Sequence, residues 1–258
     1  MEMGVSMDLF DLTGKVAMVT GSTRGLGETA AKGLAKAGAD VAVCGRNPTD
    51  LERVSAEIRA TGRKSAGFVL DVLSKEKVKN GVAEILDHFG RVDILVNNAG
   101  VNYRVPVLEY PEEMWDLVIN TNLKGYFLVA QAVVPQMIER GYGKVINLSS
   151  IFGKVGLATQ LAYASSKGGV EQMTKVMALE WAKLGVRVNA IGPTYFETDL
   201  VKQIRNDPVR FNFINERTPM GRWGYLPELE GTVVFLAAPA SDFITGQTIY
   251  VDGGWTVW

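Results

Sequence analysis

The fold is decided by one stretch near the N-terminus, Thr20-Gly21-Ser22-Thr23-Arg24-Gly25-Leu26-Gly27, which joins a buried apolar run to a long amphipathic one. The run before it, residues 15–20, predicts a strand, and residues 25–36 predict a helix that Gly38 ends. The glycines at 21, 25 and 27 permit a tight turn and a close approach of the backbone to an anion at the helix N-terminus. We therefore expect a strand–turn–helix unit that binds the pyrophosphate of a dinucleotide, against the alternative of an ordinary turn.

The alternation of strand and helix continues along the chain. Apolar runs predict further strands at residues 40–45, 66–70, 92–96, 144–148, 186–191 and 248–251, and helices at 74–89, 111–140 and 161–184. Pro48 indicates a further helix start, because proline is tolerated at early helical positions. Continuous apolar strands between helices indicate a parallel sheet that is covered on both faces. No linker, repeat or change of composition marks a boundary. The predicted fold class is α/β, a doubly wound parallel sheet of about seven strands, in a single domain over residues 1–258.

Composition excludes several classes of function. The chain has 27 Lys+Arg against 28 Asp+Glu, and this near-neutral balance argues against a nucleic-acid partner. One cysteine and one histidine exclude a disulfide framework and a Cys/His metal cluster. No run approaches the roughly 20 apolar residues of a membrane span, and the N-terminus lacks the order of a signal peptide. We expect a cytoplasmic protein with a small-molecule substrate, no metal and no membrane partner.

The end of the second strand bears on the cofactor. NAD-binding proteins usually carry an acidic residue here for the ribose hydroxyls, whereas this chain reads Cys44-Gly45-Arg46-Asn47. Arg46 follows the strand directly and Arg24 lies in the glycine-rich turn. Because guanidinium pairs well with phosphate, these residues favour NADP(H), with NAD(H) still open. The alternative is that both arginines are solvated surface charges.

A second motif predicts proton chemistry. Tyr163 and Lys167 lie four residues apart, on one face of the helix predicted at 161–184. A phenol with a pKa near 10 is a poor base at neutral pH, and a nearby cation lowers that pKa. Ser150 follows the strand at 144–148, at the edge of the sheet where ligands bind.

Together these pieces resemble the short-chain dehydrogenase/reductase family over nearly the whole chain. The matching segments are 20–27, Asp71-Val72, Asn97-Asn98-Ala99-Gly100, Asn122, Ser150, Tyr163 with Lys167, and Pro193 through Thr198. The resemblance implies a Rossmann fold and an oxidoreductase that acts on CH–OH groups. It also implies that Tyr163 is the general acid/base, that Ser150 holds the substrate oxygen, and that Lys167 lowers the pKa of Tyr163 and binds the nicotinamide ribose. Asn122 would anchor a water that feeds protons to Lys167.

The cofactor site implied by the resemblance and by the two arginines is broader. Asp71 would meet the adenine, residues 98–100 would line the cofactor, and Thr198 would touch the nicotinamide amide. The complete expected set is Gly21, Ser22, Thr23, Arg24, Gly25, Leu26, Gly27, Arg46, Asn47, Asp71, Val72, Asn98, Ala99, Gly100, Tyr163, Lys167, Pro193 and Thr198.

One residue departs from the family pattern. The family usually has Pro-Gly after the sixth strand, whereas this chain has Pro193-Thr194. A β-branched residue does not readily take the positive φ that glycine allows, so we expect this loop to run differently.

Within the family, the chain is most similar to enzymes that act on sugar acids, such as gluconate 5-dehydrogenase. The similarity lies in residues 98–104, 113–115, 217–224 and 251–255. Arg104 is the predicted partner of a substrate carboxylate, together with Ser150 and Tyr163. A 3-oxoacyl-[acyl-carrier-protein] reductase is the alternative enzyme, although the chain has no concentrated basic run for an acidic carrier protein. A non-catalytic dinucleotide sensor is the alternative of another class, and the Tyr163–Lys167 pair argues against it.

The C-terminal tryptophans bear on assembly. Trp255 and Trp258 would leave apolar surface if the chain itself did not bury them. In the resembling family such tails commonly pack between subunits, which implies a homotetramer, with a dimer as the alternative.

Overall fold

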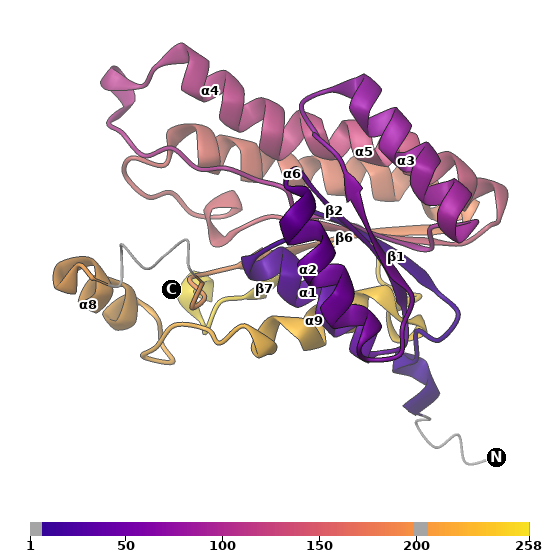
Figure 1. Cartoon of the computed structure of the whole chain (residues 1–258). Helices are drawn as coiled ribbons and strands as arrows, with labels where there is room; N and C mark the ends of the chain where they lie inside the picture. The colour runs from indigo at the N-terminus through magenta and orange to yellow at the C-terminus, as the bar shows by residue number, and fades with distance from the viewer. Residues whose placement is uncertain (1–6, 199–205, 258) are drawn as a thin grey trace.

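The described strands form one parallel sheet in the order β3-β2-β1-β4-β5-β6-β7 (Figure 1). The structure, a computed structural model, describes residues 7–198 and 206–257. The strands are β1 Val16–Thr20, β2 Asp40–Gly45, β3 Ser65–Val69, β4 Ile94–Asn97, β5 Gly143–Leu148, β6 Val186–Pro193 and β7 Thr248–Val251. All neighbouring strands pair in parallel, so every carboxyl end meets the same edge of the sheet.

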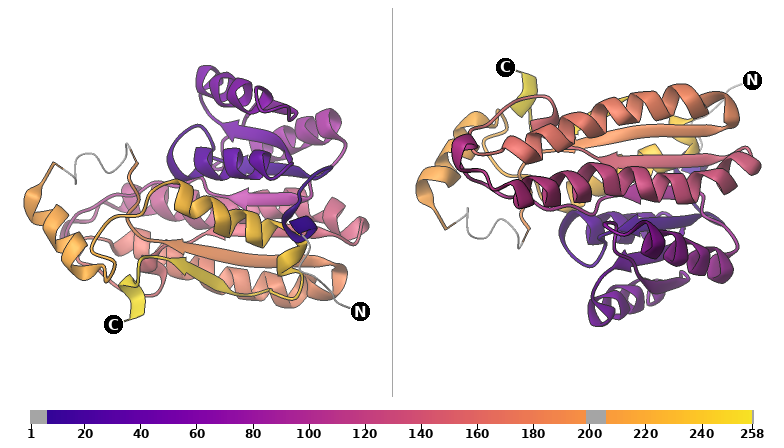
Figure 2. Two further views of the ribbon diagram at one scale, coloured as in Figure 1. Left: turned by 90° about the horizontal axis from the view of Figure 1, so that it is seen from below. Right: turned by 90° about the horizontal axis from the view of Figure 1, so that it is seen from above.

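Helices cover both faces because the strands are apolar on both sides. Ala17 and Val19 of β1 pack with α1 (Gly25–Lys36), α2 (Pro48–Arg59) and α9 (Pro227–Ala237). Met18, between them, packs on the opposite face. That face carries α3 (Lys75–Phe89), α5 (Gly125–Glu139) and α6 (Leu161–Trp181) (Figures 1 and 2).

Several further helical segments complete the described part of the chain. They are α4 (Glu112–Ile119), α8 (Pro208–Arg217), the π-helical turn η3 (Asn120–Lys124), and the 3₁₀ turns η1 (Met7–Phe10), η2 (Val107–Glu109), η4 (Ile151–Gly153), η5 (Ala182–Leu184), η7 (Pro239–Ser241) and η8 (Trp255–Val257). In both views of Figure 2, α8 lies at the end of the molecule that holds the C-terminus, away from the N-terminus.

The predicted fold class is confirmed, with corrections to single elements. Helix 25–36 and strands 40–45 and 248–251 are found with the predicted bounds, and the other strands lie within two residues of theirs. The helix predicted at 111–140 is interrupted at Asn120–Lys124, where five residues form a π turn. Residues 182–184 of the helix predicted at 161–184 form a 3₁₀ turn instead. Helices α8 and α9 were not predicted.

The helical stretch Glu112–Glu139 would pass for a membrane span by length and composition, with a mean hydropathy of 1.2 in its most apolar window. Its apolar residues have another partner, because Val129, Val133 and Met137 of α5 are buried against the sheet. More than half of the window is buried inside the fold. We therefore identify this stretch as a core helix.

The strand order also locates the ligand site. The chain builds β1, β2 and β3 outward in one direction, then returns to place β4 on the other side of β1. A sheet of this kind binds ligands at the carboxyl ends of the two strands where the direction reverses. Here those strands are β1 and β4, and the glycine-rich turn follows the first of them.

Candidate active site

The turn after β1 requires glycine at several positions. Gly21 and Gly25 have positive φ values of 63° and 55°. A Cβ atom on Gly27 would lie 2.3 Å from both the carbonyl oxygen of Gly21 and Nδ2 of Asn98. A side chain at position 27 is therefore incompatible with this packing.

Asn98, directly after β4, fastens the two strand ends together. Its Nδ2 donates hydrogen bonds of 2.9 Å to the carbonyl oxygens of Thr20 and Gly21. Its backbone N–H donates to Thr20 Oγ1 at 3.0 Å, and the next residue, Ala99, does so at 3.2 Å. A Cβ on Gly21 would lie 2.9 Å from Ala99 Cα, so residues 98–99 sit directly against the turn.

The N-terminus of α1 fits a pyrophosphate. Arg24 precedes the helix without capping it through its side chain, which leaves the first N–H groups without a side-chain acceptor. These groups and the helix dipole favour an anion. Thr198 is near, since its Cγ2 would lie 3.6 Å from a Cβ on Gly25. Thr194 Oγ1, one residue past β6, is buried and has no hydrogen-bond partner in the described structure. This arrangement fits a dinucleotide that reaches from α1 to the end of β6.

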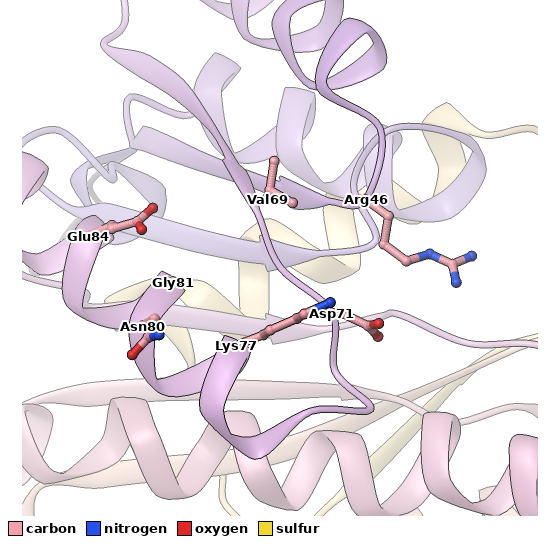
Figure 3. A pocket seen from close by; sticks show the side chains of 7 residues that line it. All are labelled: Arg46, Val69, Asp71, Lys77, Asn80, Gly81 and Glu84. Atoms are coloured by element: carbon pink, nitrogen blue, oxygen red, sulfur yellow. The ribbon is translucent and has the colours of Figure 1, made fainter.

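The part of the predicted site that would bind the adenosine ribose contains two arginines without an ion-pair partner among the described residues. Neither Arg24 nor Arg46 has an ion pair with any residue that the structure describes. Arg46 shares a hollow of about 380 Å³ with Asp71 and Lys77 (Figure 3). Because no carboxylate follows β2, this edge fits a 2′-phosphate better than free ribose hydroxyls.

Other predicted cofactor residues have structural roles in the fold. Asn47 caps α2 by accepting from Thr49 N–H at 3.0 Å. The Ser22 hydroxyl donates to Val19 O at 2.7 Å and accepts from Cys44 N–H. Val72 is buried, and its side chain lies 3.0 Å from the position of a Cβ on Gly125. These contacts place the residues beside the predicted site without themselves assigning a cofactor contact.

Ser150, Tyr163 and Lys167 converge at the carboxyl end of β5. Ser150 begins the η4 turn after the strand, and its hydroxyl lies near enough to that of Tyr163 to lower the pKa of the phenol. Tyr163 and Lys167 lie one turn apart on α6, with Lys167 Nζ 5.7 Å from the centre of the Tyr163 ring. The structure thus brings together the three residues that the sequence predicted.

The proton affinity of Tyr163 reflects opposing influences. Burial raises the pKa of Tyr163, whereas the hydrogen bond from Ser150 and the positive charge of Arg104 lower it. The nearby phenol of Tyr195 raises it further. Arg104 also lowers the pKa of Tyr195, which burial raises. The Arg104 guanidinium therefore lowers the pKa of both phenols.

Lys167 is almost completely enclosed. Its Nζ donates to Leu148 O at 2.5 Å and to the Tyr126 hydroxyl at 3.3 Å, and no carboxylate forms an ion pair with it among the described residues. Burial lowers the pKa of Lys167 to about 7. A cation that titrates near neutrality can exchange protons as well as supply charge.

Asn122 lies in the π turn and bridges two elements. Its Oδ1 accepts from Val101 N–H at 2.8 Å, and its Nδ2 donates to Val101 O and to Ser166 Oγ at 2.9 and 3.1 Å. Gly100 lies against the same side chain. Asn122 thus holds the loop after β4 against α6, and its expected water contact stays a prediction.

Sequence reasoning missed several residues of this site. Tyr126 bonds to Lys167, Tyr195 couples to Tyr163, and Asn102 donates to Gln160 at 2.9 Å. No sequence signal marks them, because aromatic and amide side chains at such positions are common in any core or helix start. Only the packing of distant segments brings them to the site.

Thr194 does not adopt positive φ, as expected for a β-branched residue; the only non-glycine residue that does in the described chain is Thr159. One expectation is corrected. Trp255 is 1% exposed and packs against Tyr195 and Phe213. It therefore leaves no apolar surface to cover, while Trp258 lies outside the described residues.

Comparison with known proteins agrees with this geometry. The family model for Enoyl-(Acyl carrier protein) reductase matches residues 21–256. The chain is 42% identical to Gluconate 5-dehydrogenase of Gluconobacter oxydans over 97% of this chain and 98% of that protein. It is 44% identical to 2-dehydro-3-deoxy-D-gluconate 5-dehydrogenase of Formosa agariphila, over 97% and 96% of the two chains. A gluconate 5-dehydrogenase from Burkholderia cenocepacia, solved in complex with NADP and tartrate, superimposes with a TM-score of 0.95 at 41% identity, covering 97% and 98% of the chains.

The buried ammonium predicts a pH-dependent stability. Below about pH 7 the native state carries the charge in an apolar setting; between pH 7 and the ordinary lysine pKa of 10.5 the unfolded state binds more protons than the native one. The amount by which Lys167 lowers the free energy of unfolding therefore decreases as the pH rises. Lys167→Met should be more stable than the parent protein, and its advantage should be about 2–3 kcal/mol larger at pH 6 than at pH 9 in urea unfolding. The exposed Lys175→Met on the same helix is the control, and an advantage independent of pH would contradict the prediction.

Proposed function

Because the chain belongs to the short-chain dehydrogenase/reductase family, we propose that it is an NADP(H)-dependent oxidoreductase that interconverts a secondary alcohol and a ketone on a sugar acid. The observation that carries this proposal is the position of Arg104, whose charge reaches Tyr163 and Tyr195 at once. Curated relatives named for gluconate and 2-dehydro-3-deoxy-D-gluconate support a substrate with a carboxylate.

The chain's own residues divide the chemistry between them. Bound NADPH supplies the hydride to the carbonyl carbon. Ser150 Oγ and the neighbouring Tyr163 hydroxyl bind the carbonyl oxygen, and Tyr163 gives it a proton. Lys167 stabilises the phenolate that remains and returns the proton, as its pKa near 7 allows. Arg104 holds the carboxylate with two parallel hydrogen bonds.

The alternatives have less support. An acyl-carrier-protein substrate shares the catalytic residues but requires a basic docking surface, and the sequence has no concentrated Lys/Arg run. A dinucleotide sensor has no use for a Tyr163–Lys167 pair at the carboxyl end of β5. The sugar-acid oxidoreductase accounts for both Arg104 and this pair.

We also propose a cytoplasmic homotetramer, with a dimer as the alternative. Apolar side chains on α5 and α6 support an assembly: Phe127, Val176 and Leu179 are 43%, 54% and 82% exposed. Val176 and Leu179 share one face of α6 by their spacing of three residues. Light scattering gives the mass in solution, and a monomer would refute the assembly.

Tyr163→Phe tests the proton donor. It retains the ring but removes the only proposed group that protonates the substrate, so kcat on 5-keto-D-gluconate should fall by about 10²–10⁴. NADPH absorbance reports the rate, and the exposed Tyr225→Phe is the control. Retained activity in a folded Tyr163→Phe protein would show that the proton comes from elsewhere.

Arg46→Asp tests the cofactor preference. The change removes a phosphate partner and supplies an acceptor for the ribose hydroxyls, so the ratio of kcat/KM for NADPH over NADH should drop by about 10- to 150-fold. Parallel titrations with both cofactors measure this ratio. A parent protein that already prefers NADH would refute the assignment.

Arg104→Ala tests the carboxylate contact. Loss of charge-assisted hydrogen bonds worth roughly 1.5–3 kcal/mol should raise KM for sugar acids by about 10- to 150-fold. Neutral ketoses lack the group that is bound, so their KM should change little. An equal loss on acids and ketoses would point to a structural role of the loop instead.

A further inference from the structure

Gln160 is a buried amide beside the catalytic tyrosine. It directly precedes α6, three residues before Tyr163, and only 2% of it is exposed. Its Oε1 accepts a hydrogen bond of 2.9 Å from Asn102 Nδ2. Because Asn102 lies two residues before Arg104, this bond connects the loop that carries Arg104 to the helix that carries Tyr163.

The other end of the amide has no partner. Nε2 of Gln160 donates to no residue that the structure describes. In the described structure, six residues have a fully buried side-chain polar atom without a hydrogen-bond partner, and Gln160 is not one of them. Its Nε2, which also has no partner, must therefore belong to the small part of the side chain that is exposed. An amide fixed at its oxygen thus presents two free donors at the start of α6, at a nitrogen that solvent or a ligand can reach.

The backbone before Gln160 is strained. Thr159 has φ of 70°, the only positive value for a non-glycine residue in the described chain, and it is β-branched. Such conformations persist where the surroundings enforce them and they cluster at binding sites. Here the strained residue directly precedes Gln160, where the chain enters α6.

We propose that Gln160 is a specificity-determining residue whose Nε2 donates a hydrogen bond to a hydroxyl oxygen of the substrate, and that Asn102 is the positioning residue that orients it. The inference rests on the proposed function, in which Arg104 holds the carboxylate and Tyr163 serves the reacting carbon. Gln160 is joined to both segments, so the hydroxyl it binds lies on the carbons between those two groups. The site therefore selects polyhydroxy acids over acids of the same length without hydroxyls.

A matched pair of keto acids tests this selection. 5-Keto-D-gluconate and 5-oxohexanoate have the same separation of carboxylate and carbonyl, but the second has no hydroxyl. Gln160→Met should lower kcat/KM for 5-keto-D-gluconate by about 5- to 100-fold, mainly through KM, and leave 5-oxohexanoate unchanged or improved. Gln172→Met, the same exchange at an exposed position of α6, is the control. An equal loss on both substrates, or no loss on either, overturns the proposal.

Asn102→Ala separates positioning from general stability. Asn102 is itself exposed, so this variant should fold even if Gln160→Met does not. It should reproduce the selective loss on 5-keto-D-gluconate, and it should add nothing in the Gln160→Met background, because both changes remove the same contact. Additive losses in the double variant would overturn the positioning role.

Failure of the proposed function gives a different result. If the parent protein reduces neither keto acid, the sugar-acid assignment is wrong, and hydroxyacetone against acetone becomes the matched pair. A selective loss on hydroxyacetone in Gln160→Met would still support the donor role, and an equal effect on both ketones would refute it.

Discussion

The close approach of Asn98 to the glycine-rich turn is the constraint on which the rest of the site depends. Position 27 has no room for a Cβ, and the Asn98 amide occupies that space while it bonds to Thr20 and Gly21. This contact fixes where the chain leaves β4. The next residues of this loop are Val101, which bonds to Asn122, and Asn102, which bonds to Gln160. The packing of the glycine-rich turn therefore also determines where the substrate-side loop begins.

Low polarity sets the proton chemistry at this edge of the sheet. The same burial that lowers the pKa of Lys167 raises that of Tyr163, so burial alone weakens both the cation and the phenolate. Few polar contacts oppose it: Ser150 and Arg104 act on the tyrosine, and Leu148 O accepts from the lysine. Each contact therefore has a larger effect than it would have in water.

The sequence predicted the fold class and the convergence of Ser150, Tyr163 and Lys167 because the patterns behind both predictions are local. The turn at 20–27 and the Tyr163–Lys167 spacing are readable over a few residues. The π turn was not, since the apolar periodicity of 111–140 continues through it and its contact with Val101, through Asn122, joins segments that are distant in the sequence. Gln160 was missed for the same reason, and Trp255 was misjudged because its partners Tyr195 and Phe213 are 60 and 42 residues away.

The π turn has a consequence for how chains of this kind diverge. A π turn accommodates one residue more than an α-helical turn, so insertion of a single residue into a regular helix would produce one. Loss of one residue between 120 and 124 would restore a continuous helix and leave α5 packed on the sheet. It would withdraw Asn122 from Val101, however, and release the loop that carries Arg104. A one-residue gap at this point in an alignment would therefore separate chains that keep the fold from chains that also keep this site.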